Sequence, residues 1–184
     1  MRRVLTTVHI LLACFFLPIA LMFAATGGLY TLAIKGGYDE RTLPVSVTEP
    51  HGTDLAQWLQ TATSALETAG EAPPSGNASL KKAGTSMELE WTGVARDVVL
   101  RPTADTLHME LVIKDNTTWR HLVQLHKAKG SDVARAISVA WAIALVLLVV
   151  TGAWMALTVP KYRRLALPAS AAGVLSFAGY VLLG

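Results

Sequence analysis

The sequence has almost no cysteine and lacks the short motifs that mark common enzyme sites. Cys14 is the only cysteine in 184 residues, so no intramolecular disulfide can form. The polar middle of the chain contains no nucleophile elbow, phosphate-binding loop, HExxH or CxxC motif. A folded domain in this region must therefore be held together by packing, and the sequence predicts no catalytic residue in it.

Charged residues are absent from three long stretches. Residues 4–34, 136–160 and 165–184 contain no Asp, Glu, Lys or Arg. Each stretch has the roughly 20 residues that a helix needs to cross the hydrocarbon core of a bilayer. We therefore predict three transmembrane helices, within residues 1–34, 134–159 and 165–184. The missing charges also argue against a proton or ion transporter, because ionisable side chains are expected within the spans of such proteins.

The charges that are present divide the chain into two sides. All thirteen Asp and Glu residues lie between Asp39 and Asp132. Two arginines precede the first apolar stretch, and a basic turn at residues 160–164 joins the second to the third. Short basic segments stay on the cytoplasmic side of a membrane, which places the N-terminus and this turn inside. Residues 35–133 and the C-terminus are then outside, and the basic balance reflects membrane orientation, so we expect no nucleic-acid partner.

A cleaved signal peptide is the alternative interpretation of the first apolar stretch. Small residues at 22–25 lie near a position where cleavage could occur. The apolar run, however, greatly exceeds the roughly 7 to 15 residues of a signal-peptide core. We therefore predict an uncleaved anchor.

The outer region has the pattern of one helix followed by an antiparallel meander. Thr53 or Asp54 can cap a helix that ends near Gly70, with apolar residues at three- and four-residue spacing. Strands are predicted at about 86–91, 95–101 and 107–113 from alternation, whereas the Gly- and Pro-containing segment 35–51 is predicted to be an extended connector. The fold expected outside the membrane is thus α+β, with the helix covering one sheet face. Its expected core residues are Trp58, Met87, Trp91 and Met109.

An amphipathic segment leads from this domain into the second span. Thr117 can cap a helix over residues 117–129, in which Trp119, Leu122 and Leu125 form an apolar stripe. We predict that this helix lies in the membrane interface with Trp119 near the headgroups.

Short motifs at the ends of the apolar stretches resemble the PepSY-associated transmembrane family. They are Val8-His9-Ile10, Ala25-Thr26-Gly27-Gly28-Leu29-Tyr30, Leu125-His126 with Gly130, and Thr151-Gly152-Ala153-Trp154. The resemblance extends over most of the chain up to Leu157. It implies a bacterial inner (cytoplasmic) membrane protein with an N-terminal helix, an outward PepSY domain and a returning helix, here followed by one extra helix.

The same resemblance implies a role for two histidines in an alternative function. Larger members of the family are associated with siderophore-iron reduction and hold haem with membrane histidines, a pattern that falls on His9 and His126 here. By their places in the sequence the two residues are roughly a membrane thickness apart, so one haem cannot use both. A second axial ligand would have to come from His51, His108, a second copy of the chain or another subunit. We therefore expect no cofactor and no enzymatic activity, with a haem-binding electron-transfer protein as the alternative.

Small residues indicate where partner helices can pack. Gly27 and Gly28 near the outer end of the first span, and Gly173 in the third, let helix backbones approach closely. With the interfacial Trp119, they predict contacts with lipid and with a membrane-embedded complex or a second copy of the chain. The predicted function is that of a non-catalytic accessory, stabilising or assembly subunit. Restraint of an outer peptidase is a third interpretation that follows only from the family's name.

Overall fold

The computed structural model describes residues 2–84 and 86–183. Met1, the first residue of the first expected span, and Gly184, the last residue of the third, lie outside the described residues. The chain forms two compact units, Leu21–Val139 and Met1–Ala20 with Ala140–Gly184, and each unit is considered by itself.

Within the described residues, three helices are long and apolar enough to cross a membrane, as the sequence predicts, and are compatible with a membrane location. They are α1 (Arg2–Thr31), α4 (Asp132–Thr158) and α5 (Pro160–Leu183). The turn expected at residues 160–164 instead belongs to the start of α5, so Val159 alone separates α4 from α5. Proline suits the first helical position, where its missing N–H loses no hydrogen bond and its φ angle is already helical. That is why Pro160 begins a helix here instead of extending the turn.

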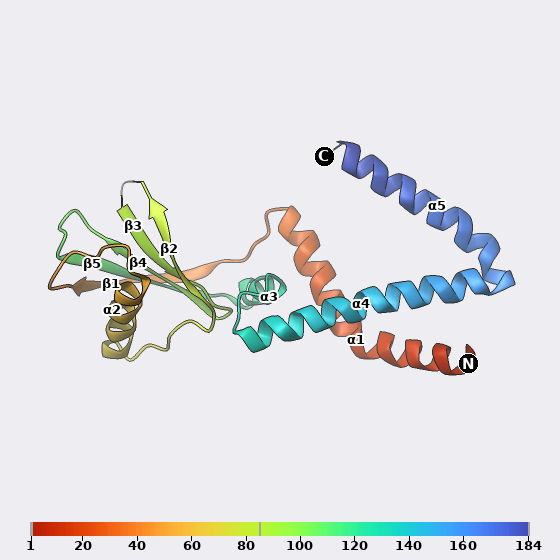
Figure 1. Cartoon of the computed structure of the whole chain (residues 1–184), viewed down its shortest axis with the longest axis horizontal. Coiled ribbons are helices and arrows are strands. Elements are labelled where there is room, and N and C mark those ends of the chain that lie inside the picture. Colours follow the sequence, from red (N-terminus) through yellow and green to blue (C-terminus); the bar gives the residue numbers. More distant parts are fainter. Residues whose placement is uncertain (1, 85, 184) are drawn as a thin grey trace. The chain divides into compact units, whose positions relative to one another are not determined.

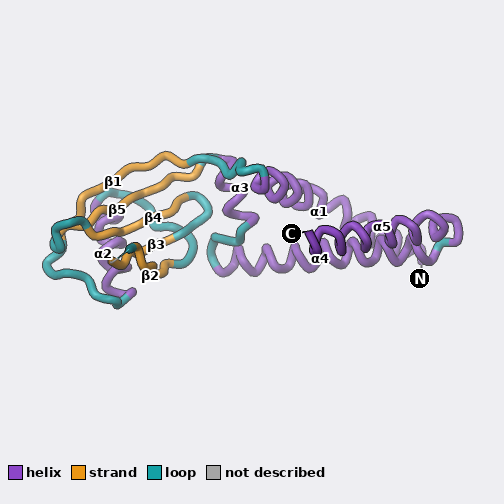
Figure 2. The backbone as a smooth tube through the Cα atoms, turned by 90° about the horizontal axis from the view of Figure 1, so that it is seen from above, coloured by secondary structure: helices purple, strands orange, loops and turns teal. Residues whose placement is uncertain are grey.

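A five-stranded antiparallel sheet forms the centre of the unit Leu21–Val139 (Figures 1 and 2). Its strand order is β1-β5-β4-β3-β2. The strands are β1 (Tyr38–Ser46), β2 (Ala78–Ala83), β3 (Ser86–Trp91), β4 (Arg96–Pro102) and β5 (His108–Asn116). The last three confirm the predicted meander. The first two were not predicted, and β1 replaces much of the expected connector.

Strand β1 tolerates a proline because it lies at the sheet edge. Val47 donates its backbone N–H to the Leu107 carbonyl oxygen at 3.0 Å, which makes 47 and 107 a hydrogen-bonded pair. Counting back in steps of two, the odd-numbered residues of β1 turn their backbone groups toward β5 and the even-numbered ones turn them outward. Pro44 is even-numbered, so its missing N–H faces away from the sheet and costs no ladder hydrogen bond.

Helix α2 (Leu55–Thr68) covers one face of this sheet. The Asp54 side chain accepts a hydrogen bond from the Ala56 N–H at 3.0 Å and so caps the helix as predicted. The core between helix and sheet contains Trp58, Ala62, Leu66, Leu89, Val98, Leu100, Met109, Leu111 and Ile113. Of the four expected core residues, Trp58 and Met109 are buried, and Met87 and Trp91 are partly buried against the same cluster.

Helix α3 (Thr118–His126) follows β5 beyond the end of the sheet (Figures 1 and 2), and one buried carboxylate of β4 holds it there. Asp97 accepts hydrogen bonds from the Gly93 N–H at 3.0 Å and from the Gln124 side-chain amide at 3.1 Å. Val123 and Gln124 are therefore the buried residues of α3, and Trp119 on the predicted apolar stripe remains only partly buried.

Candidate functional site

In each unit a histidine singled out by the sequence pairs with a threonine on another helix. In the unit Leu21–Val139, His126 at the end of α3 lies with its Nδ1 atom 2.7 Å from Thr26 Oγ1 on α1. The Phe23 ring, one helical turn before Thr26, lies 4.8 Å from the imidazole between ring centroids. Since Thr26 is itself only 1% exposed, this contact is sheltered from solvent.

The other unit has the same kind of pair, but here α1 supplies the histidine and the later helix supplies the threonine. His9 on α1 lies with its Nδ1 atom 2.9 Å from Thr151 Oγ1 on α4. The partners are 142 residues apart in the sequence, so this contact ties α1 to α4.

The hydrogen of each threonine hydroxyl is already used, which requires that Nδ1 of the histidine carry a hydrogen. Thr26 Oγ1 donates to the Met22 carbonyl oxygen at 2.6 Å, and Thr151 Oγ1 donates to the Leu147 carbonyl oxygen at 2.7 Å. A hydroxyl has one hydrogen, so toward the imidazole each oxygen can only accept. The histidine Nδ1 must then donate, and in the neutral ring Nε2 keeps a free lone pair.

A glycine beside each threonine makes room for the ring. A Cβ atom built on Gly27 would lie 3.3 Å from His126 Cε1, and one built on Gly152 would lie 3.3 Å from His9 Cε1. Any larger residue at either position would push the imidazole away from its hydroxyl. The two sites therefore have the same arrangement, a Thr-Gly pair on one helix and a histidine on the other. A polar contact of this kind holds apolar helices together.

The cavities near these pairs do not enclose a haem by themselves. A cavity of about 160 Å³ lies beside His126, lined by Thr26, Gly27, Tyr30, Val123, His126 and Lys127. Sites for organic ligands usually occupy about 300 to 1,000 Å³. A larger apolar groove of about 1,050 Å³ lies between the start of α1 and the end of α4, but its lining in the described chain does not include His9. Each histidine thus offers one Nε2 atom and no enclosing pocket.

The other predicted contact residues have different surroundings. On Gly27, a built Cβ atom would meet His126 of the same chain, and a partner contact at this residue stays a prediction. Gly28 and Gly173 have no atom within 4 Å of a built Cβ, so their faces are open. Trp119 donates its indole N–H to the Ile34 carbonyl oxygen at 3.1 Å, which ties α3 to the segment after α1.

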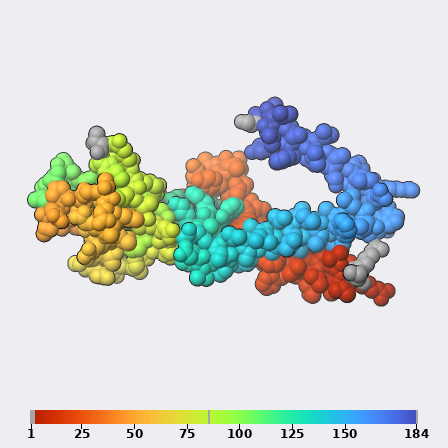
Figure 3. Space-filling model, in the orientation of Figure 1, coloured from red at the N-terminus to blue at the C-terminus, as the bar shows by residue number. Residues whose placement is uncertain are grey.

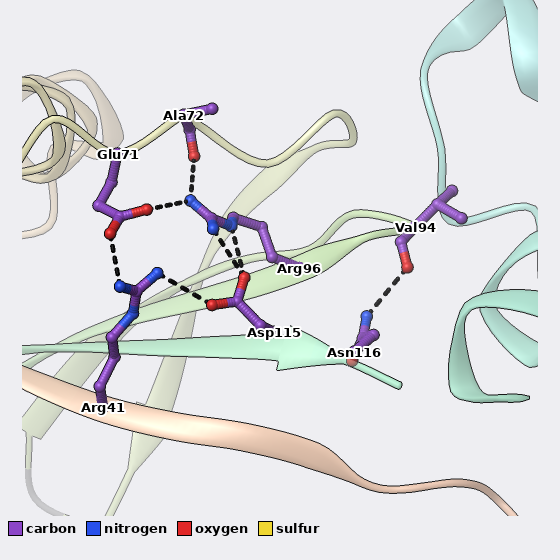
Figure 4. Close-up of polar contacts among 7 residues, drawn as sticks. All are labelled: Arg41, Glu71, Ala72, Val94, Arg96, Asp115 and Asn116. Atoms are coloured by element: carbon purple, nitrogen blue, oxygen red, sulfur yellow. Dashed lines mark hydrogen bonds and ion pairs between the residues drawn. The ribbon is translucent and has the colours of Figure 1, made fainter. Parts of the chain in front are cut away.

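The most connected charges in the sheet domain form a closed ring (Figure 4). Arg41 and Arg96 each bind both Glu71 and Asp115, with nitrogen–oxygen distances of 2.6 to 2.9 Å. Burial opposes the charged form of Arg96, but the bonds to Glu71 and Asp115 outweigh it, so its pKa is raised above the ordinary value. The ring joins the loop after α2 to strands β1, β4 and β5. Because every charge in the ring is paired, the ring supplies no reactive group.

Comparisons with protein-family models, curated proteins and solved structures give no match to this chain. The likeness to the PepSY-associated family thus remains a prediction from the quoted motifs.

Sequence reasoning missed the threonines as partners. Both Thr-Gly pairs belong to the motifs quoted for the family likeness, but nothing local linked Thr26 to His126 or Thr151 to His9. The available signal was that Thr-Gly occurs twice near the ends of apolar stretches and that the chain has two histidines at similar places. Among the described residues no group of three or more His, Cys, Asp or Glu side chains is placed to hold a metal ion.

Proposed function

We propose that this chain is a non-catalytic inner-membrane protein that acts as an accessory, stabilising or assembly subunit of a larger membrane complex. In this proposal the PepSY-like domain and the C-terminus lie outside, and the N-terminus lies in the cytoplasm. The orientation follows from the basic residues at the N-terminus and between α4 and α5.

The observation that carries the proposal is the unpaired state of α5. This helix begins beside the end of α4 and then diverges from it (Figures 1 and 3). Its large apolar side chains are exposed, among them Leu175 and Phe177, and no residue of α5 is buried. Ala169 and Gly173 are four residues apart on one side, a spacing of small residues that is typical of closely packed membrane helices. A helix whose packing face is open within its own chain is suited to a partner.

The two His–Thr pairs support the same function. They give α1 a polar contact with α4 and another with α3, and in membrane proteins such hydrogen bonds contribute roughly 0.6 to 1.7 kcal/mol each. The histidines are thereby used in assembly of the chain itself.

Purification at native expression in a mild detergent tests the proposal. Mass spectrometry should identify a stable set of larger membrane subunits with the wild-type chain. Gly173→Leu should remove them, because it places a bulky side chain on the small-residue face of α5. Val174→Leu is the matched control, since it enlarges the adjacent residue, which is 67% exposed. Loss of the partners in both variants, or in neither, contradicts the proposal.

Haem binding is the second candidate function, and the free Nε2 lone pair of His9 and His126 favours it. The chain supplies one such nitrogen at each site, so the other axial ligand and part of the enclosure would have to come from another protein or a second copy. The visible spectrum of the same purified fraction tests this. A Soret band stoichiometric with the chain alone supports haem, whereas haem that follows only the partner subunits supports the accessory function.

A further inference from the structure

A small cavity with basic walls lies where the sheet domain meets α4. Its volume is about 220 Å³, roughly seven times the 30 Å³ that one water molecule occupies in the liquid. Three cations line it, Lys127, Lys129 and Arg135, together with the polar side chains of Asn77 and Thr92. The described lining includes no carboxylate, and Asp132 binds Arg135 from outside the lining.

The geometry of the loop before α4 brings two of these lysines together. Helix α3 ends in a turn in which Lys129 N–H binds the Gln124 carbonyl oxygen at 3.1 Å and Ala128 N–H binds that of Leu125 at 3.0 Å. Ala128 adopts a positive φ of 53°, which reverses the chain there. As a result, the consecutive residues Lys127, Ala128, Lys129 and Gly130 all line this one cavity.

Arg135 has unused binding capacity. One nitrogen, Nη2, binds Asn77 Oδ1 at 3.0 Å and Asp132 Oδ1 at 2.5 Å. Its Nε atom is buried and makes no hydrogen bond among the described residues. A single charge-assisted hydrogen bond from Nε to a phosphate oxygen would satisfy this donor.

The charges around Lys129 also favour an incoming anion. Burial lowers the pKa of Lys129, and the neighbouring cations Lys127, Lys81 and Arg120 lower it further, while Asp97 acts in the opposite direction. The carboxylate of Asp97 already accepts hydrogen bonds from Gly93 and Gln124, so it neutralises this cluster of cations only in part. Two cations also share one aromatic ring nearby, because Lys35 and Lys127 lie 5.2 and 5.5 Å from the centre of the Tyr30 ring.

The cavity lies at the depth of lipid headgroups if α4 spans a membrane. A helix of 27 residues is about 40 Å long, which exceeds the roughly 30 Å of hydrocarbon by three or four residues at each end. The first turn of α4, with Asp132 and Arg135, is then at the interface, and residues 127–131 are beside it.

We propose that this cavity binds the phosphate of an anionic phospholipid, with Lys127, Lys129 and Arg135 as its ligands. The inference rests on the membrane location in the proposed function. A lipid is favoured over free phosphate because the site adjoins an apolar helix that can hold the acyl chains, and because the cations form a cluster that suits a negatively charged headgroup.

Native mass spectrometry of the full-length, delipidated protein tests the site, with phosphatidylglycerol and phosphatidylcholine as probes. Wild-type protein should retain phosphatidylglycerol in preference to phosphatidylcholine. Lys129→Gln should weaken that retention about fivefold, as expected for the loss of one basic residue near an anionic lipid. The variant should fold, since the charge it removes is partly buried and has no hydrogen-bonded partner in the described chain. Lys82→Gln, the same change on the exposed strand β2, is the control and should not weaken it.

The remaining outcomes overturn the proposal in distinguishable ways. Equal retention of both lipids, or equal weakening by both variants, means that no specific phosphate site exists. Displacement of phosphatidylglycerol by millimolar inorganic phosphate identifies a free anion as the ligand. Recovery of the chain from cells without detergent would refute the membrane location itself, whereas a membrane-bound chain without lipid preference refutes only the site.

Discussion

The two arginines of the charge ring offer a test of how burial sets the strength of an ion pair. Both bind Glu71 and Asp115, but Arg96 has a side chain only 18% exposed, whereas that of Arg41 is 46% exposed. Arg96 also donates to the Ala72 carbonyl oxygen at 2.9 Å. Replacement of either residue by methionine keeps most of the length of the side chain and removes the charge.

The expected magnitudes differ because the partner left behind differs in its access to water. Removing one member of a buried pair costs about 3 to 5 kcal/mol, and an exposed pair contributes about 1 kcal/mol or less. In Arg96→Met, Glu71 and Asp115 remain partly buried but keep Arg41, so we expect a loss of about 2 to 3 kcal/mol. In Arg41→Met both acids keep Arg96, and water reaches the vacated side, so we expect about 0.5 to 1 kcal/mol.

Urea titration of the full-length protein in mild detergent measures both values, with tryptophan fluorescence as reporter, to which the core residue Trp58 contributes along with the other four tryptophans. For a domain of this size the slope is about 1.5 kcal/mol per molar urea, so the midpoint should fall by about 1.3 to 2 M in Arg96→Met. In Arg41→Met it should fall by about 0.5 M. A midpoint that falls equally in the two variants would refute the assignment of the ring's stability to Arg96, the less exposed arginine.

Two further predictions concern backbone positions and use the same titration. Gly76→Ala should cost more than about 3 kcal/mol, because a Cβ there would lie 2.3 Å from the Lys129 carbonyl oxygen, whereas Gly52→Ala has open space and should cost under about 1 kcal/mol. Ala128→Gly should stabilise the protein by about 0.5 to 1 kcal/mol, because its positive φ of 53° is unfavourable for alanine. Gly70→Ala, at the end of α2 with φ of 70° and open space, should destabilise by a similar amount. Equal midpoints within either pair would contradict the respective prediction.

The parts of the fold that were predictable from sequence are those in which one local signal dominates. The uncharged runs were long enough to identify the three apolar helices. Asp54 and the three- and four-residue spacing that follows it identified α2, and alternation identified β3, β4 and β5. In each case the apolar residues of a single segment already indicate which side faces the core.

The two outer strands were not predictable in this way, for a physical reason. In β1 the signal against a strand was Pro44, which is harmless only because the chain places it on the outward side of an edge strand. In β2 a sequence with two adjacent lysines shows little alternation, and its pairing with β3 comes from the hairpin. Strand β1 pairs with β5, which lies far along the sequence, and β2 pairs with β3 across a hairpin. The residue pattern within β1 or β2 alone does not indicate these pairings.

The histidine contacts extend the same argument to the site. Thr26 and His126 are 100 residues apart, and only the packing of α1 with α3 decides that the hydroxyl faces the imidazole. Once it does, Nδ1 serves the helix contact and Nε2 alone remains for any ligand. Replacement of His126 by alanine would remove both at once, so it cannot separate a structural histidine from a haem ligand. Thr26→Val can, because it removes the hydrogen bond and leaves Nε2 in place: loss of stability without change in the visible spectrum indicates a helix contact, and a shifted Soret band indicates a ligand.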